Sequence, residues 1–125
     1  EERISALVDR LRKEASRRRT LVVAAADLAH MGPAFGDPFP MDPVWRAKVS
    51  AADRAVMEAM CHGDAEGFFA QVKQEGDRRR ICGLAPIYLA LRVLDGARGE
   101  IADYLHCPAD EADTSLVSIC GIYLW

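Results

Sequence analysis

The stretch that decides the fold is Leu21-Val-Val-Ala-Ala-Ala-Asp27-Leu-Ala-His30, in which a short apolar run ends at polar residues. The run Leu21–Ala26 is too short for a buried helix and predicts a strand that is apolar on both faces. An amphipathic helix is predicted before it, because apolar residues recur at helical spacing at Ile4, Leu7, Val8 and Leu11. A helix followed by such a strand predicts an α/β fold, with helices packed on a mixed sheet.

A proline-rich loop is predicted directly after this stretch, at residues 31–43, which hold four of the six prolines of the chain. Repeated proline fixes φ and removes main-chain donors, so no regular structure is expected there. A loop of this length in a compact domain is usually functional, and disorder is the alternative. Beyond the loop, Ser50 is expected to cap a helix that ends at His62-Gly63.

Two more helices and two strands complete the expected order. Asp64 is predicted to cap a helix that forms an αα-hairpin with the preceding one. A buried helix is predicted to begin at Pro86, since proline is pre-set for a first helical turn. Residues 101–107 and 114–124 are predicted to be strands on either side of an acidic turn.

Length, charge and cysteine usage narrow the class of protein. The 125 residues suit one domain over residues 1–125, and 16 basic against 19 acidic residues argue against a dedicated nucleic-acid binder. The longest apolar run is too short to cross a bilayer, so no membrane span is expected. Four cysteines without a C-x-x-C pair, and no secretory signal pattern, predict a cytoplasmic protein with reduced thiols. Abundant arginine and alanine suggest a GC-rich bacterial source.

The first candidate site is formed by Asp27 and His30, three residues apart where the apolar run ends. Ligands of open α/β sheets collect beyond the carboxyl ends of the strands, so both side chains are expected in one cleft. Together they offer metal ligation or general acid–base chemistry. The alternative is a turn in which Asp27 only caps main-chain N–H groups.

The second candidate is Cys82, which stands with Gly83 just before the helix predicted at Pro86. The positive end of a helix dipole favours the thiolate, and the arginines at 78–80 act in the same direction. A thiolate attacks electrophiles or binds metal, whereas an inert buried cysteine is the alternative. His62 and His106 are expected to have structural or surface roles.

Two segments together resemble one family. Residues 24–32, Ala-Ala-Ala-Asp-Leu-Ala-His-Met-Gly, resemble the A-S-S-D-[FL]-[SC]-H-[WY]-G segment of the Memo family. Residues 81–87, Ile-Cys-Gly-Leu-Ala-Pro-Ile, resemble its I-C-G-[RH]-x-P-I segment. The order of the segments, the helical hairpin between them and the closing strand also match. In bacteria the family is called AmmeMemoRadiSam system protein B, and the chain resembles about the C-terminal half of a member.

The resemblance implies a fold similar to the class III extradiol dioxygenases, which use non-haem iron. It places Asp27, His30 and Cys82 in the catalytic pocket, together with two histidines from the N-terminal half of a family member. Cys82 and His30 would then be metal ligands for iron or copper, with Asp27 orienting a ligand or acting as a base. An enzyme built this way would be a metal-dependent oxidoreductase.

Several positions depart from the family pattern, namely Ala25, Ala26, Ala29, Met31 and Leu84. These changes remove polar donors around the pocket, and the two N-terminal histidines have no counterpart among the three histidines present. The chain is therefore expected to be an incomplete domain, and its Glu1-Glu2 start to be a break within a larger fold. The expected partner is the missing N-terminal half or another protein chain.

Two rival functions remain open on the sequence. Eukaryotic members are described as binding phosphotyrosine peptides, so the same cleft, with His30 and nearby arginines, could receive a phosphorylated peptide or small anion without turnover. The other rival is a degenerate scaffold that keeps its packing and has lost its chemistry, as the serine-to-alanine changes favour.

Overall fold

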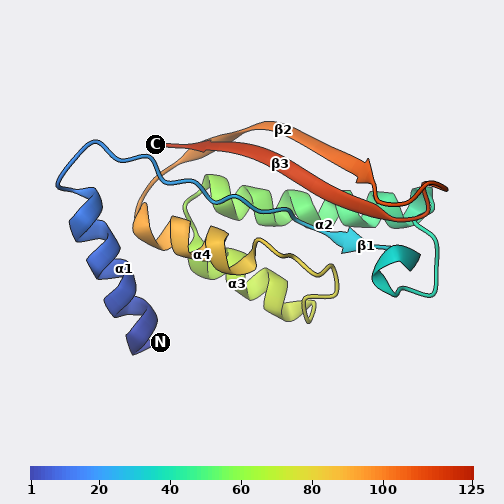
Figure 1. The fold of residues 1–125 in the computed structure, drawn as a ribbon, viewed down its shortest axis with the longest axis horizontal. Helices are drawn as coiled ribbons and strands as arrows, with labels where there is room; N and C mark the ends of the chain where they lie inside the picture. Colours follow the sequence, from blue (N-terminus) through green and yellow to red (C-terminus); the bar gives the residue numbers. More distant parts are fainter.

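A computed structural model describes residues 1–125 as helices packed on one sheet, which confirms the predicted α/β class (Figure 1). The elements in chain order are α1 (Glu2–Ala15), β1 (His30–Met31), the 3-10 helix η1 (Pro33–Phe35), α2 (Pro43–Cys61), α3 (Ala65–Gln74), α4 (Leu84–Val93), β2 (Gly99–Pro108) and β3 (Leu116–Leu124). No helix is both long and apolar enough to span a membrane.

The sheet has the strand order β1-β3-β2, and both pairings are antiparallel, where the sequence predicted a mixed sheet. The long strands β2 and β3 pair from Gly99 opposite Leu124 to Pro108 opposite Leu116, close to the predicted bounds. Asp110 closes the acidic turn between them by accepting a hydrogen bond from the Thr114 main-chain N–H at 2.7 Å. The hairpin fixes the position of β3, against which the short β1 pairs.

The predicted strand at Leu21–Ala26 is wrong. These residues cross the molecule without a turn but form no main-chain hydrogen bond (Figure 1). Main-chain hydrogen bonds to β3 begin only at Leu28 and Ala29, which bond to Ser118, and His30–Met31 then pairs with β3 as β1. Apolar composition makes a strand favourable only where a neighbouring main chain supplies partners, and here none does.

Helix α2 begins at Pro43, seven residues before the Ser50 cap that the sequence predicted. The Asp42 carboxylate accepts a hydrogen bond from the Trp45 N–H at 2.8 Å, so aspartate and proline provide the start signal. That signal was hidden inside the predicted loop 31–43, which also contains the short regular element η1. Ser50 therefore lies in the interior of the helix.

The other helix boundaries lie close to the predicted ones. Asp64 caps α3 as predicted, accepting a hydrogen bond from the Gly67 N–H at 2.8 Å. Helix α4 begins at Leu84, two residues before Pro86. Helix α1 is amphipathic as predicted, but Val8 is its only buried residue.

The main core lies between the helical hairpin, α4 and the sheet, and is formed by Leu28, Val56, Met57, Ala59, Met60, Ala65, Phe68, Val72, Ile81, Ile87, Tyr88 and Leu91. A smaller cluster packs Met31 and Leu116 of the sheet against Val49 of α2. Leu28 belongs to the first cluster and Met31 to the second. The segment that carries Asp27 and His30 is thus held by Leu28 and Ala29 between the two polar residues and by Met31 after them, all of which are buried.

Candidate metal site

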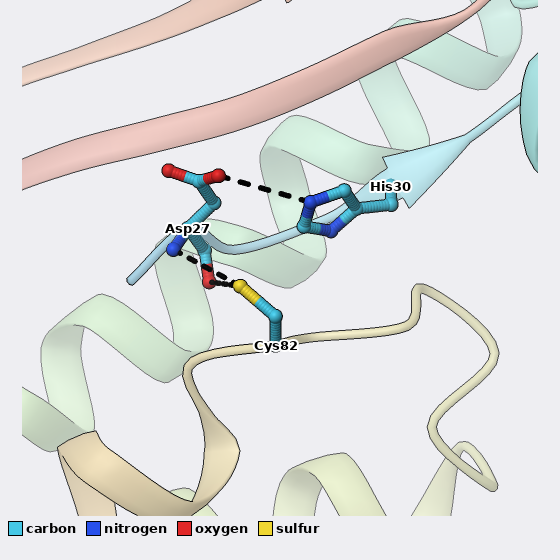
Figure 2. A group of neighbouring side chains, drawn as sticks. All are labelled: Asp27, His30 and Cys82. Carbon is cyan, nitrogen blue, oxygen red and sulfur yellow. Dashed lines mark hydrogen bonds and ion pairs between the residues drawn. The ribbon is translucent and has the colours of Figure 1, made fainter. Parts of the chain in front are cut away.

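Asp27, His30 and Cys82 come together in the structure (Figure 2). One ligand atom from each, a carboxylate oxygen, a ring nitrogen and the sulfur, lies within 4.8 Å of the other two. Asp27 Oδ2 is 3.8 Å from His30 Nε2. All three donor types are metal ligands, so the cluster has the composition of a metal site.

The loop before α4 brings Cys82 to Asp27 through main-chain contacts. The Asp27 N–H donates to Cys82 Sγ at 3.2 Å, and the Gly83 N–H donates to the Asp27 carbonyl at 3.1 Å. A Cβ at Gly83 would lie 2.8 Å from that carbonyl oxygen and 2.6 Å from a methyl group of Ile87. Glycine is therefore needed after Cys82 so that the two segments can approach this closely.

The orientation of the His30 ring leaves one nitrogen available. Nδ1 lies 3.2 Å from the Leu28 carbonyl oxygen and 3.0 Å from the Arg80 carbonyl oxygen. Carbonyl oxygens only accept, so Nδ1 carries the proton of the neutral ring and Nε2 presents a lone pair. Nε2 is the nitrogen that faces Asp27. A main-chain carbonyl that fixes the tautomer in this way is typical of metal-binding histidines.

Arg80 and Asp37 hold the main chain on the far side of His30. The Arg80 guanidinium donates to the His30 carbonyl at 3.2 Å and to the two Asp37 carboxylate oxygens at 2.9 and 3.1 Å. Asp37 also accepts a hydrogen bond from the Gly32 N–H at 2.8 Å. The Arg80 hydrogen bond holds the pKa of Asp37 below its usual value, so this pair stays charged. It anchors the proline-rich loop against the site.

The cluster opens to solvent on one side. The His30 side chain is 18% exposed and that of Asp27 is 49% exposed, while Cys82 is exposed. Solvent access of this kind leaves room for a ligand or water beside three protein donors, as in catalytic metal sites.

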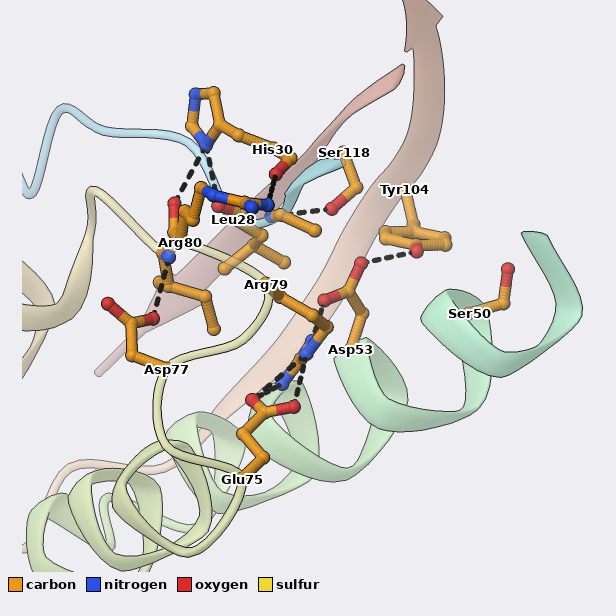
Figure 3. A network of polar contacts seen from close by, with 12 residues as sticks. Leu28, His30, Ser50, Asp53, Glu75, Asp77, Arg79, Arg80, Tyr104 and Ser118 are labelled. Atoms are coloured by element: carbon orange, nitrogen blue, oxygen red, sulfur yellow. Dashed lines mark hydrogen bonds and ion pairs between the residues drawn. The ribbon is translucent and has the colours of Figure 1, made fainter. Parts of the chain in front are cut away.

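A second polar cluster, built around Asp53, is closed to solvent, in contrast to the first (Figure 3). Arg79 forms an ion pair with Asp53 and another with Glu75, whose Oε1 lies 2.7 Å away. The Tyr104 hydroxyl donates to Asp53 at 2.6 Å, and its oxygen lies 2.8 Å from Nε2 of His106. Burial raises the pKa of Tyr104 and lowers that of His106. No buried side-chain nitrogen or oxygen in the chain lacks a partner.

The arginines at 78–80 have roles that the sequence did not indicate. The sequence suggested that these arginines favour the Cys82 thiolate or receive an anion, yet Arg79 is buried and Arg80 is paired with Asp37. Arg78 lies 4.9 Å from the centre of the Trp45 ring as a cation–π contact. Neither Arg80 nor Asp37 stood out by spacing, because their partners are distant along the chain.

A comparison with protein families matches residues 1–123 to the family described as Memo-like protein. The chain belongs to the Memo-like protein family. No curated protein matches it. In this Memo-like chain the three clustered side chains come from the two segments, 24–32 and 81–87, that carry the resemblance.

Proposed function

We propose that this Memo-like protein binds a redox-active first-row metal, iron or copper, through Cys82 Sγ and His30 Nε2, with the Asp27 carboxylate as a third donor. The support is the approach of the three donor atoms to within 4.8 Å of one another. A thiolate together with an imidazole suits these metals better than an all-oxygen set, which favours magnesium or calcium.

The observation that carries the proposal is the fixed tautomer of His30. A histidine that only packed in the turn would have no need for its Nδ1 to point at two carbonyl oxygens while Nε2 faces a carboxylate. The arrangement resembles the outer contacts that orient histidine ligands and raise their basicity. In the neutral ring it directs the Nε2 lone pair toward the cluster, as ligation requires.

When bound, iron or copper would supply one-electron redox chemistry. The chain itself would provide three ligands and leave the solvent-facing side open for a small substrate. Asp27, whose Oδ1 forms no hydrogen bond or ion pair, would accept a proton there. We therefore propose a metal-dependent oxidoreductase of the Memo type, located in the cytoplasm, where reducing conditions keep Cys82 free.

The rival function, recognition of a phosphorylated or anionic ligand, has less support. The guanidinium of Arg80, beside His30, is already paired with Asp37, and that of Arg79 is buried between two carboxylates. The third arginine of this loop, Arg78, packs on the Trp45 ring. An anion bound at the cluster would also be repelled by the Asp27 carboxylate.

The test is metal binding by the untagged chain under reducing conditions. The purified protein is reconstituted with Fe(II), Cu(I) or Co(II), and bound metal is measured by mass spectrometry after desalting. We expect about one metal per chain, with a thiolate-to-metal charge-transfer band in the Co(II) form. Cys82→Ser should abolish the band, and His30→Gln should weaken metal binding by about 10- to 100-fold or more.

Two matched controls separate ligation from general effects of losing a thiol or an imidazole. Cys107→Ser removes a half-buried cysteine outside the cluster, and His62→Gln removes an exposed histidine. Both should bind metal like the parent protein. Equal metal content in Cys82→Ser and the parent protein would overturn the proposal.

A further inference from the structure

An open groove lies where α1 ends and the chain turns back to cross the molecule (Figure 1). It has a volume of about 470 Å³ and is lined by four parts of the chain: the last turns of α1, the turn at residues 18–20, the start of the segment 21–26 and the end of α4. Its apolar lining consists of Leu11, Ala15, Leu21, Val22 and Val93. A groove of this size with mostly apolar walls suits a small ligand.

The walls of the groove are held in place by polar contacts. Arg12 of α1 donates through Nε to the Arg92 carbonyl of α4 at 3.0 Å and pairs with Asp95 at 3.4 Å. The Thr20 hydroxyl donates to the Ala15 carbonyl at 3.1 Å and closes the turn after α1. The groove is therefore a built feature of the fold, in which α1 and α4 are tied to each other.

The apolar walls are open to a ligand. Leu21 is 85% exposed and Leu11 is 42% exposed, so the chain itself leaves much of this surface uncovered. The lining contains no aromatic residue, and a nucleotide base would have no ring to stack on. It also contains no histidine or cysteine that could hold a metal. Aliphatic walls of this kind favour the transfer of an alkyl chain out of water.

The rim of the groove is cationic. Arg18 and Arg19 line it, both are exposed, and neither guanidinium forms a hydrogen bond or an ion pair. Glu14, the one carboxylate in the lining, is already paired with Arg17 at 3.1 Å. Residues 1–19 carry seven basic residues against four acidic ones, although the whole chain is net negative. Unpaired guanidinium groups bind carboxylate or phosphate through paired hydrogen bonds.

We infer that this groove binds a single-chain amphiphile with an anionic head group. The alkyl chain lies against Leu11, Leu21 and Val93, and the head group pairs with Arg18 and Arg19. The groove shares no residue with the cluster of the proposed metal site, so the inference goes beyond the proposed function and requires no metal.

Charge and shape favour this occupant over two others. In a two-fold dimer that covered the groove, the arginine-rich rim of one copy would meet the same rim of the other. The repulsion between these rims disfavours a second copy. A membrane surface is flat, whereas the apolar side chains here line a hollow between α1 and α4.

NMR titration of the ¹⁵N-labelled chain tests the ligand. Dodecanoate, kept below its micelle concentration, should give saturable shifts of the amides that line the groove and leave those of Asp27 and His30 unchanged. Dodecyl phosphate should bind at the same amides, and the ratio of the two Kd values identifies the preferred head group. Dodecyltrimethylammonium has the same chain with a cationic head, and it should bind at least about tenfold more weakly.

Two pairs of variants test the rim and the wall. Arg18→Gln combined with Arg19→Gln should raise the Kd for dodecanoate about tenfold or more. Arg3→Gln combined with Arg10→Gln, at two exposed arginines of α1 outside the lining, should leave it unchanged.

Leu21→Glu places a carboxylate in the apolar wall and should also raise the Kd about tenfold or more, whereas Val44→Glu, at an exposed valine of α2, should not. Thermal unfolding checks that each variant is folded.

Three results would overturn the inference. The first is binding of the cationic amphiphile as tight as that of dodecanoate, or no saturable binding of either anionic amphiphile. The second is sedimentation of the chain with phosphatidylglycerol vesicles but no binding of dissolved dodecanoate, which would identify a membrane surface. The third is self-association of the wild-type chain that Leu21→Glu abolishes, which would identify a second copy as the occupant.

Discussion

Two polar clusters meet the loop that joins α3 to α4, and they differ in how fully their members are paired. Around Arg79 every charge has a partner, and Asp53 is 0% exposed. Around Cys82, by contrast, three donor atoms approach one another, and the only hydrogen bonds among them are those of the Cys82 sulfur with the Asp27 main chain. The first cluster serves the fold, since a buried polar group must be satisfied, and the second is the one for which we propose a ligand.

The largest effect is expected from breaking the closed cluster. Arg79→Met would leave Asp53 and Glu75 facing each other without a cation, and we expect a loss of about 3–5 kcal/mol in the free energy of unfolding. Urea denaturation measures it, with Arg54→Met at an exposed position of α2 as the control. Adding Asp53→Asn to Arg79→Met should restore part of the loss, and no recovery would mean that the uncompensated charge is not its cause.

The open cluster should respond to metal and the closed one should not. At a free metal concentration about 100 times its Kd, the wild-type free energy of unfolding should rise by about 2.7 kcal/mol. His30→Gln should lose this gain while its metal-free stability changes by less than about 1 kcal/mol. Thermal unfolding with metal and then with chelator measures both. A metal gain that persists in His30→Gln would contradict the assignment of this ligand.

Asp37 supports the open cluster, and a smaller effect is expected there. Asp37→Asn should lower the free energy of unfolding by about 1–2 kcal/mol at neutral pH, because charge-assisted bonds to Arg80 are lost. The folded pKa of Asp37 is lowered from 3.8, so its contribution is present above that pH and is lost as the pH falls through the folded value. Urea denaturation at decreasing pH should show that the difference in the free energy of unfolding between wild type and variant becomes smaller below about pH 4. A difference that is independent of pH would argue against the ion pair.

The smallest effect concerns His106 in the closed cluster. Burial lowers the pKa of His106 from 6.5. The positive charge of Arg46 also lowers it, whereas the negative charge of Asp53 raises it. The neutral ring contributes stability above pH 6.5, and this is lost as the pH falls from there toward the folded value. His106→Gln should therefore reduce the acid sensitivity of unfolding by about 1 kcal/mol or less, while His62→Gln should not. NMR titration of both imidazoles provides the independent check.

Much of the secondary structure could be predicted from local signals. His62-Gly63 ends α2, where Gly63 has a positive φ, and Asp64 then caps the start of α3. These local residue preferences identify the boundary between the two helices. The alternation of residues 114–124 likewise predicted β3. The start of α2 was missed because the Asp42-Pro43 signal stood among other prolines that indicated a loop.

The sequence by itself identified the three residues of the candidate site, because the motif segments around Asp27, His30 and Cys82 are short and local. Only the tertiary structure decided that Cys82 lies against the main chain of Asp27, since a contact across 55 positions depends on how the loop before α4 packs. It also decided that Leu21–Ala26 is not a strand. Hydrophobicity is a property of the residues themselves, but a strand exists only when a second main chain completes its hydrogen bonds.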